Sequence, residues 1–567
     1  MIKHDSIRKK IISLMLIAIL ALLAYKIIFI HTNETNNDKT LKEKGYDQTI
    51  GTVILRGYRG KIIDKYSIPL AVELPLNDII IDPSLLQKPF YSHVAKVLNI
   101  SENELEKKIK TSPSKKYLAI KKNLEINSPI IKKLKETISK YYKIEKNGKV
   151  KKEKIHGVSL KYSSKRYYSQ AETTAPLLGL TDSNLNGIEG IERIYQNVLK
   201  GSNGKKKVAF DSKRKEPFSD IKVIKPAIQG KDLALTIDSS IQYFSYVALK
   251  NAVIKHNADS GSAIVLSNQG DILALVNYPT INPNNRKKYK PEYYRNYAIA
   301  DIFDIGSTIK PFIAMLAMQE NKISIDEIVD VSRPIKIGSK VLKTTKDKKL
   351  SVSEILQKSH NIGMVKIAGK IEKKKMWQIL DTLGFGKVTK ILPGSENDGK
   401  LHHYINWTSA DKKSLAYGYG IDATLVQLAK SYLIFANKGK VIDLSIIKDN
   451  KNKKNSFQVF KPEIVKNTIP ILKSVVENGT GKLAKINNIS IAGKTGTVQI
   501  YKNGKYYSDK HRAFFVGFTP AEDAKYIMAI AIENPKTGGY EGGKVAAPVF
   551  KQTIEDILKF NYRLAEL

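Results

Sequence analysis

A serine and a lysine three residues apart offer the clearest chemistry in this sequence. Ser307 and Lys310 stand in the stretch 303–312, Phe-Asp-Ile-Gly-Ser-Thr-Ile-Lys-Pro-Phe. On a helix this spacing puts the amine beside the hydroxyl. A neutral lysine there accepts the serine's proton if desolvation or a cationic neighbour lowers its pKa, and the apolar run 312–318 offers a buried setting. Pro311 fits only the first turn of a helix, so we expect the helix to start at about Ser307.

The sequence gives little support for a thiol nucleophile, a metal site, a phosphate-binding loop or a hydrolase-type serine elbow. Without cysteine there is no thiol nucleophile or zinc–thiolate cluster, and the nine histidines are scattered. Two stretches nearly match the phosphate-binding loop motif. The stretch 394–400 has its glycines and lysine but is followed by Leu401, which has no hydroxyl for magnesium. The stretch that ends in Lys494-Thr495 has the hydroxyl, but Asn488 stands where the first glycine of the motif belongs. No G-x-S-x-G elbow surrounds a serine. We therefore predict no metal and no cofactor.

The serine–lysine pair gains weight from two later motifs. S-x-x-K alone recurs by chance in so lysine-rich a chain, for example at Ser112 and Ser409. An S-x-N motif, Ser359-His360-Asn361, follows, and Lys-Thr-Gly occurs at 494–496 and at 536–538. The copy at 494 runs into alternating residues 497–500, which predict a strand, whereas the copy at 536 follows a proline and predicts a turn. The ordered set is more specific than any one motif.

In this order the three elements resemble those of the class B penicillin-binding proteins, a family of serine acyltransferases. The stretches 59–64 and 69–71 are similar to the opening motif of that family, and 187–192 to the G-x-E-G-x-E of its pedestal domain. Further similar stretches are 235–238, 417–420, 427–429, 540–543 and 546–550. Within class B, S-x-N and the C-terminal segment favour the FtsI-type septal transpeptidases. The chain departs from the family pattern at Lys65, Tyr66-Ser67, Ser169 and Asp304-Ile305.

The resemblance implies a mechanism in which Ser307 attacks the penultimate D-Ala of a peptidoglycan stem peptide and a second stem resolves the acyl-enzyme into a crosslink. Lys310 acts as base, Ser359 passes the proton to the leaving amine and Asn361 holds Lys310. The backbone amides of Ser307 and Thr497 bind the oxyanion. The substrate carboxylate meets Lys494, Thr495 and Thr497, while Gly496 lets the strand edge approach closely. β-Lactam antibiotics acylate the same serine.

The resemblance also implies the fold class: α+β, with a membrane-anchored, elongated, β-rich pedestal (dimerisation-like) domain followed by a penicillin-binding/β-lactamase-like transpeptidase domain, an antiparallel sheet flanked by helices. Patterning agrees with strands at 52–55, 61–63, 233–237, 261–266 and 271–276, helices within 84–147 and a helix over 239–255. We expect a pedestal over 51–225 and a transpeptidase domain over 226–567, with a boundary stretch at 205–226.

The N-terminus predicts a membrane anchor. A basic tail, 1–10, precedes a nearly continuous apolar run, 11–30, about one bilayer thickness of helix, and a polar linker, 31–50, follows. No small-residue cleavage site ends the run, so we expect an uncleaved span. The basic excess before the span predicts a cytoplasmic N-terminus and an external catalytic domain. The family resemblance implies that this membrane is the bacterial inner membrane and that the protein acts at the division septum.

Composition bears on the partners. The net charge of +41 is spread over the whole 567-residue chain without a basic helix, which argues against nucleic acid. The predicted partners are peptidoglycan stem peptides, β-lactams, a membrane glycosyltransferase of the FtsW type and other division proteins. Two alternatives stay open: an elongation-specific transpeptidase, and a non-catalytic β-lactam sensor or scaffold.

Overall fold

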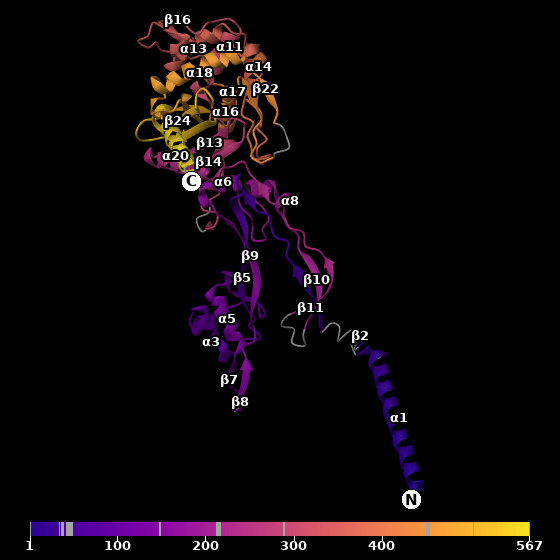
Figure 1. Cartoon of the computed structure of the whole chain (residues 1–567). Coiled ribbons are helices and arrows are strands. Elements are labelled where there is room, and N and C mark those ends of the chain that lie inside the picture. Colours follow the sequence, from indigo (N-terminus) through magenta and orange to yellow (C-terminus); the bar gives the residue numbers. More distant parts are fainter. Residues whose placement is uncertain are drawn as a thin grey trace. The chain divides into compact units, whose positions relative to one another are not determined.

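The fold was obtained as a computed structural model (Figure 1). It describes residues 2–32, 34–35, 39–40, 49–146, 149–210, 217–286, 290–449, 454–502 and 504–565. The predicted linker, 31–50, lies largely outside the described residues. Two compact units form, one from 1–60 with 200–231 and the other from 61–199 with 232–567.

The first unit begins with a long apolar helix. Helix α1 (Ile2–Thr32) contains the segment Ile7–Phe29, whose mean hydropathy of 2.6 and 23-residue length suffice to cross a membrane. This segment begins four residues before the predicted span. The finding fits a single-pass membrane anchor.

The first unit also contains a short antiparallel pair, β1 (Glu34–Thr35) with β2 (Lys39–Thr40), and a three-stranded antiparallel sheet. Its order is β11 (Pro217–Lys225), β10 (Gly204–Phe210) and β3 (Ile50–Leu55). The strand predicted at 52–55 is therefore confirmed. Within 205–226, the stretch that we expected to mark a domain boundary, the described residues form two lysine-rich strands that pair with each other. Their polar composition hides the strand pattern, and cross-strand pairing supplies what local propensity lacks.

In the second unit, residues 61–199 form a mixed domain. Strand β5 (Pro69–Ile81) pairs with β4 (Ile62–Ile63), β6 (Leu118–Glu125) and β9 (Val158–Tyr168), and β12 (Leu233–Ala234) pairs with β4. Helices α3 (Tyr91–Leu98), α4 (Glu102–Lys110) and α5 (Pro129–Ser139) supply residues to the core that lies against β5, while β7 (Tyr141–Lys146) and β8 (Lys149–Lys154) form a hairpin. Our expectation of helices throughout 84–147 missed β6 and β7. The segments that follow β9 include α6 (Ala175–Leu178), α7 (Gly190–Ile194) and α8 (Gln196–Leu199).

A five-stranded antiparallel sheet organises the rest of this unit. Its order is β14 (Ile272–Tyr278), β13 (Ser260–Ser267), β25 (Tyr526–Glu533), β24 (Lys505–Thr519) and β23 (Ala492–Lys502), so β23 is an edge strand. Alternate side chains of β24 enter two cores: Phe514 packs with α11 (Lys310–Gln319) and α16 (Leu425–Ser431), and Phe515 with α9 (Ser239–Lys255) and α20 (Ala547–Ala565). The sheet is thus covered on both faces, as the α+β prediction requires.

The remaining elements surround this sheet (Figure 1). The helices are α10 (Tyr297–Ala300), α12 (Val352–Gln357), α13 (Asn361–Gly369), α14 (Lys373–Thr382), α15 (Ser409–Leu415), α17 (Leu433–Ala436), α18 (Pro462–Glu477) and α19 (Gly542–Val545). The short strand pairs are β15 (Phe303–Asp304) with β20 (Asp422–Ala423), β16 (Ile328–Asp330) with β19 (Lys349–Ser351), β17 (Ile335–Ile337) with β18 (Lys340–Leu342), and β21 (Lys440–Ile442) with β22 (Ser456–Gln458).

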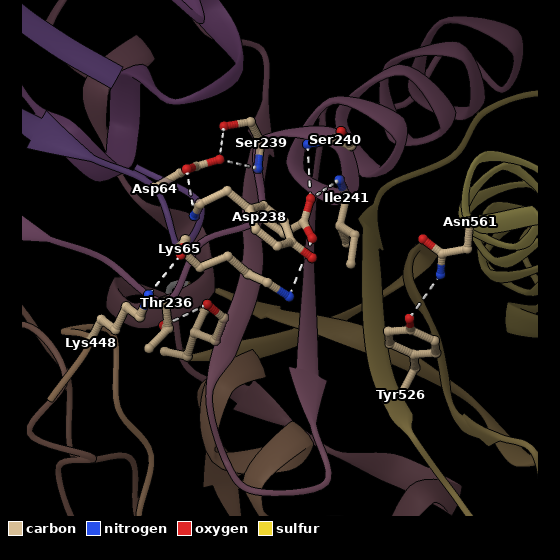
Figure 2. Close-up of polar contacts among 12 residues, drawn as sticks. Asp64, Lys65, Thr236, Asp238, Ser239, Ser240, Ile241, Lys448, Tyr526 and Asn561 are labelled. Carbon is tan, nitrogen blue, oxygen red and sulfur yellow. Dashed lines mark hydrogen bonds and ion pairs between the residues drawn. The ribbon is translucent and has the colours of Figure 1, made fainter. Parts of the chain in front are cut away.

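The start of α9 is bound to the chain that follows β4 (Figure 2). The buried Asp64 carboxylate accepts hydrogen bonds from the Ser239 hydroxyl at 2.6 Å and from the amides of Tyr66 and Ile68, both at 2.8 Å. Lys65 lies 3.4 Å from Asp238, the residue that caps α9. Burial is the largest single influence and lowers the pKa of Lys65, but the interactions with Asp238 and Tyr66 together outweigh it and the net pKa is raised. Lysine therefore forms an ion pair at the position where the family has arginine.

Candidate active site

Ser307 lies in a tight turn at the beginning of a buried helix. The 3-10 turn Gly306–Ile309 contains it, and the regular α-helix, α11, starts at Lys310 with Pro311 in its first turn. The predicted start at Ser307 is therefore three residues early. The serine still stands at the amino end of α11, where unpaired amides concentrate partial positive charge.

Two glycines fix this turn. Gly306 has φ +55°, and its amide donates a 3.0 Å hydrogen bond to the carbonyl of Gly418. A Cβ on Gly306 would lie 2.6 Å from a methyl of Val498, and one on Gly418 would lie 1.9 Å from the Gly306 carbonyl oxygen. The stretch 417–420 thus packs against the serine turn and supports it, a role that no pattern in its sequence predicts.

Lys310 is completely buried and its amine bonds to the S-x-N motif. Nζ lies 2.6 Å from the Ser359 carbonyl oxygen, 2.6 Å from Asn361 Oδ1 and 3.1 Å from Ser359 Oγ. Burial, and then the charge of Lys494, hold the pKa of Lys310 well below its usual value. A neutral amine fits these contacts, because it can donate to the carbonyl and amide oxygens and accept from the hydroxyl.

The S-x-N motif lies in the connection between α12 and α13. Ser359 has φ +57°, a left-handed conformation that costs about 1 kcal/mol in a residue with a Cβ. This conformation accompanies the contact of the Ser359 carbonyl with Lys310. Asn361 is the first residue of α13, so the helix holds the backbone from which its amide side chain extends.

Lys494 reaches the same hydroxyl from the edge strand β23. Its Nζ donates to Ser359 Oγ at 2.9 Å, and the side chain is completely buried. Burial lowers the pKa of Lys494 to about 7. A carboxylate bound beside Lys494 would favour the charged form and raise this pKa.

A cleft of about 410 Å³ opens over this network. Ser307, Ser359, Thr495, Gly496 and Thr497 line it, together with 479–480, 482–483 and 541–544. The Thr497 hydroxyl accepts a 3.0 Å hydrogen bond from the Gly542 amide, and Thr495 and Thr480 share one of 2.6 Å. Gly496 faces the serine turn, where a Cβ would lie 3.1 Å from the Thr308 methyl.

The structure thus brings together every residue that the three motifs predicted. Lys310 and Lys494 lie next to Ser359, and Ser307 shares the cleft with 495–497. Within the described stretch 290–449, the structure shows no hydrogen bond between Ser307 Oγ and Lys310 Nζ, as is common before substrate binds. The second Lys-Thr-Gly copy lies in the turn after β25, as predicted, where Lys536 pairs with Asp259 at 2.5 Å.

Sequence reasoning missed one acidic residue beside the serine turn. Asp304 accepts hydrogen bonds from the Tyr506 hydroxyl at 2.8 Å and from the Gly420 amide at 2.9 Å. Burial raises its pKa to about 6 although both hydrogen bonds oppose the shift. Its only sequence signal was the departure from the family's glutamate. Asp304 connects strand β24 and the 417–420 stretch to the nucleophile's turn.

Comparison with known proteins covers nearly the whole chain. The family models for the penicillin-binding protein dimerisation domain and the penicillin binding protein transpeptidase domain match residues 54–235 and 261–555. The second range contains all the predicted site residues.

Named relatives and solved structures agree with these domain matches. The chain is 33% identical to the peptidoglycan D,D-transpeptidase FtsI of Buchnera aphidicola subsp. Baizongia pistaciae, covering 98% of this chain and 96% of the relative. It is 30% identical to FtsI of Escherichia coli K12, covering 88% and 83%. A penicillin binding protein 3 structure from Mycobacterium tuberculosis, complexed with aztreonam, matches with a TM-score of 0.68 at 20% identity over 90% of this chain and 97% of that one. This last likeness concerns the fold.

Proposed function

The chain belongs to the penicillin-binding protein family with a dimerisation and a transpeptidase domain, and we propose that it is the D,D-transpeptidase that crosslinks peptidoglycan stem peptides during septum formation. The observation that carries the proposal is the contact of two buried amines with one hydroxyl, Ser359 Oγ, at the floor of the cleft that holds Ser307. Burial holds the pKa of Lys310 well below its usual value, as a lysine that activates a serine nucleophile requires.

In the proposed acylation step, Ser307 Oγ attacks the carbonyl of the penultimate D-Ala and its proton passes to Lys310. The bond to the terminal D-Ala breaks, and its amine takes a proton from Ser359, which Lys310 or Lys494 restores. The amides of Ser307 and Thr497 hold the oxyanion. The turn at Gly306 packs against Thr497, since a Cβ there would lie 3.8 Å from the Thr497 nitrogen, and this supports placing both amides at one point.

Substrate recognition is assigned to β23. Thr495 and Thr497 line the cleft and Lys494 lies directly beside them, so a terminal carboxylate finds two hydroxyls and a cation. In deacylation the amine of a second stem peptide attacks the acyl carbonyl and loses a proton to Lys310, which passes that proton to Ser307 Oγ as the ester bond breaks, so that the serine hydroxyl and the neutral lysine are both restored. A β-lactam enters by the same attack, but its amide nitrogen stays attached to the acyl group.

Labelling with a fluorescent penicillin tests the nucleophile. Ser307→Ala should abolish covalent labelling, whereas Ser112→Ala and Ser409→Ala, which alter other S-x-x-K matches, should leave it intact. Mass spectrometry should place the acyl group on Ser307. An acyl group on any other serine contradicts the assignment.

Topology and domain roles complete the proposal. The N-terminus lies in the cytoplasm, the single span anchors the chain, and the part after it lies outside the inner membrane, with a pedestal at 51–225 and a transpeptidase domain at 226–567. Protease added to spheroplasts should digest the C-terminal domain from outside. A fully protected C-terminal domain would exclude this topology.

The pedestal is assigned to partner binding, with a glycosyltransferase of the FtsW type as its first partner. A fluorescent fusion should gather at midcell, and the full chain should co-purify with that glycosyltransferase. Localisation along the lateral wall would favour the elongation role, and normal septation by the Ser307→Ala variant would favour a scaffold.

A further inference from the structure

The hairpin that contains β10 and β11 is strongly basic. Residues 204–225 include eight Lys and Arg against three Asp and Glu, a net charge of +5 on 22 residues, whereas the whole chain carries +41 on 567. The net charge per residue is therefore about three times the average of the chain. The three acidic residues can neutralise only three of the eight cations, so the hairpin keeps a positive field that attracts anions.

The strand register gathers lysines on one face of the sheet. Lys205 of β10 stands opposite Lys225 of β11, and Lys207 stands opposite Lys222. Side chains directly opposite each other, and those two residues apart on one strand, lie on the same face. These four lysines therefore share a face, which we call the lysine face. Like charges directly opposite each other destabilise a sheet, so the two lysine pairs favour a state in which an anion lies against them.

The opposite face of the same sheet shows an ordinary ion pair. Lys206, which lies between two residues of the lysine face, donates to Asp220 at 2.7 Å. On the third strand, β3, the lysine face continues with Ile54, which is 50% exposed, and with Thr52. Among the described residues of these three strands, Asp220 is the only acidic residue, and it lies on the other face. The anion that the lysine face requires therefore comes from outside these strands.

The chain itself keeps this sheet close to a membrane surface. The segment long and apolar enough to cross a membrane ends at Phe29, and β3, in the same compact unit, begins at Ile50. The 20 residues between them, 30–49, span at most about 70 Å even when fully extended. Near an anionic membrane surface each lysine strengthens binding about fivefold, and its aliphatic stem can lie along apolar groups while the amine reaches a phosphate.

We propose that the lysine face binds the anionic lipid headgroups of the membrane in which the chain is anchored, with Ile54 in contact with the interfacial layer. Lipid phosphates would relieve the repulsion within both lysine pairs. An acidic protein would meet the same charges, but the anchor places lipid within reach of this face at all times, which favours the lipid. The proposal requires the membrane anchor and does not depend on the chemistry proposed for Ser307.

A fluorophore on a single cysteine tests the contact in the full-length protein, because the chain has no cysteine of its own. Thr52→Cys places the label on the lysine face, and Val223→Cys, opposite Lys206, places it on the other face. The protein is reconstituted in vesicles that contain a lipid with a nitroxide on its headgroup. This lipid should quench the label at 52 at least about twofold more strongly in vesicles with phosphatidylglycerol than in pure phosphatidylcholine. The label at 223 should show no such difference, and about 0.5 M salt should abolish the difference at 52.

A double substitution and a matched control test the lysines themselves. Lys205→Gln with Lys225→Gln removes one lysine pair and should reduce the lipid-dependent quenching at 52 at least about twofold. Lys143 and Lys152 stand directly opposite each other in the β7–β8 hairpin of the other unit, so Lys143→Gln with Lys152→Gln removes the same charge and should leave the quenching unchanged. Circular dichroism and melting check that the variants fold.

Two results would overturn the proposal. Equal quenching at 52 in the two kinds of vesicle would favour an acidic protein as the occupant of the lysine face. Equal loss in both double variants would assign the effect to the net charge of the chain and not to this face. A chain that shows the predicted quenching but is not acylated at Ser307 would refute the proposed function and support this inference.

Discussion

Replacing Lys494 by methionine should move the pH dependence of acylation. The charge of Lys494 is, after burial, the second cause that lowers the pKa of Lys310. Methionine keeps the length of the side chain and removes the charge. Lys310 must be neutral to act as base, so acylation rises with pH through its pKa. Without the charge of Lys494 the pKa of Lys310 rises. The acid limb of the pH–rate profile, where acylation increases as Lys310 loses its proton, therefore moves to higher pH.

The structure sets the size of this shift. Both amines contact Ser359 Oγ, at 3.1 and 2.9 Å. Their nitrogens are therefore at most about 6 Å apart, and two full charges at that distance repel by about 2.8 kcal/mol at an effective dielectric constant of about 20, or about 2 pKa units. Because Lys494 itself has a pKa of about 7, its charge is present below neutrality and acts on Lys310 there.

The assay is the second-order rate of acylation by a penicillin between about pH 5 and 9, measured for the parent and for Lys494→Met. The variant should be slower throughout, since it also lacks a carboxylate partner, but the midpoint of its acid limb should be higher by about 1 to 2 units. Thr495→Val is the control: it weakens binding and should leave the midpoint in place. An unmoved midpoint in Lys494→Met, or one displaced to lower pH, would refute the assigned coupling.

Four further substitutions test the other roles. Lys310→Arg should fold yet show essentially no acylation, because arginine stays protonated, while Lys494→Arg should acylate slowly and bind carboxylate substrates less well; if Lys494→Arg is the less active of the two, the roles are reversed. Asp304→Asn should remove a pH-dependent cost: a pKa of about 6 in the fold against about 4 unfolded means that the parent loses about 2 kcal/mol of stability as pH rises from 4 to 7. Urea unfolding at both pH values measures this, and identical profiles for parent and variant would count against it. Gly418→Ala should cut penicillin acylation at least about a hundredfold, because its Cβ would lie 1.9 Å from the Gly306 carbonyl oxygen and shift the serine turn; acylation at the parent rate would show that the turn tolerates the change.

Helices and strands could be predicted where a capping residue or a regular spacing of apolar residues marks them within a short stretch of sequence. The helix over 239–255 was predicted with the bounds that α9 has, because Asp238 caps it and apolar residues recur along it. The paired strands β10 and β11 were missed, since their lysines carry no apolar alternation and only pairing reveals them.

The catalytic residue types could be predicted from motif order, whereas their electrostatics could not. Spacing in the sequence places Lys310 near Ser307, but its bonds run to Ser359 and Asn361, 49 and 51 residues away. The Asp304–Tyr506 contact spans 202 residues. Burial lowers the pKa of Lys494, and Lys494 is completely buried because of packing around β23. The Lys-Thr-Gly motif alone does not predict this burial.

The two lysines differ because their surroundings differ. Both are fully buried, but Lys310 has a carbonyl, an amide oxygen and a hydroxyl around it, whereas Lys494 reaches the Ser359 hydroxyl and the Thr495 carbonyl beside the open edge of β23. In the proposed mechanism, a carboxylate that binds to that edge stabilises the charged form of Lys494. The negative charge of the carboxylate offsets part of the effect of that cation on Lys310, so burial remains the main cause of the low pKa of Lys310. Both amines contact Ser359 Oγ, and in this mechanism the Ser359 hydroxyl therefore connects the carboxylate-binding lysine with the base.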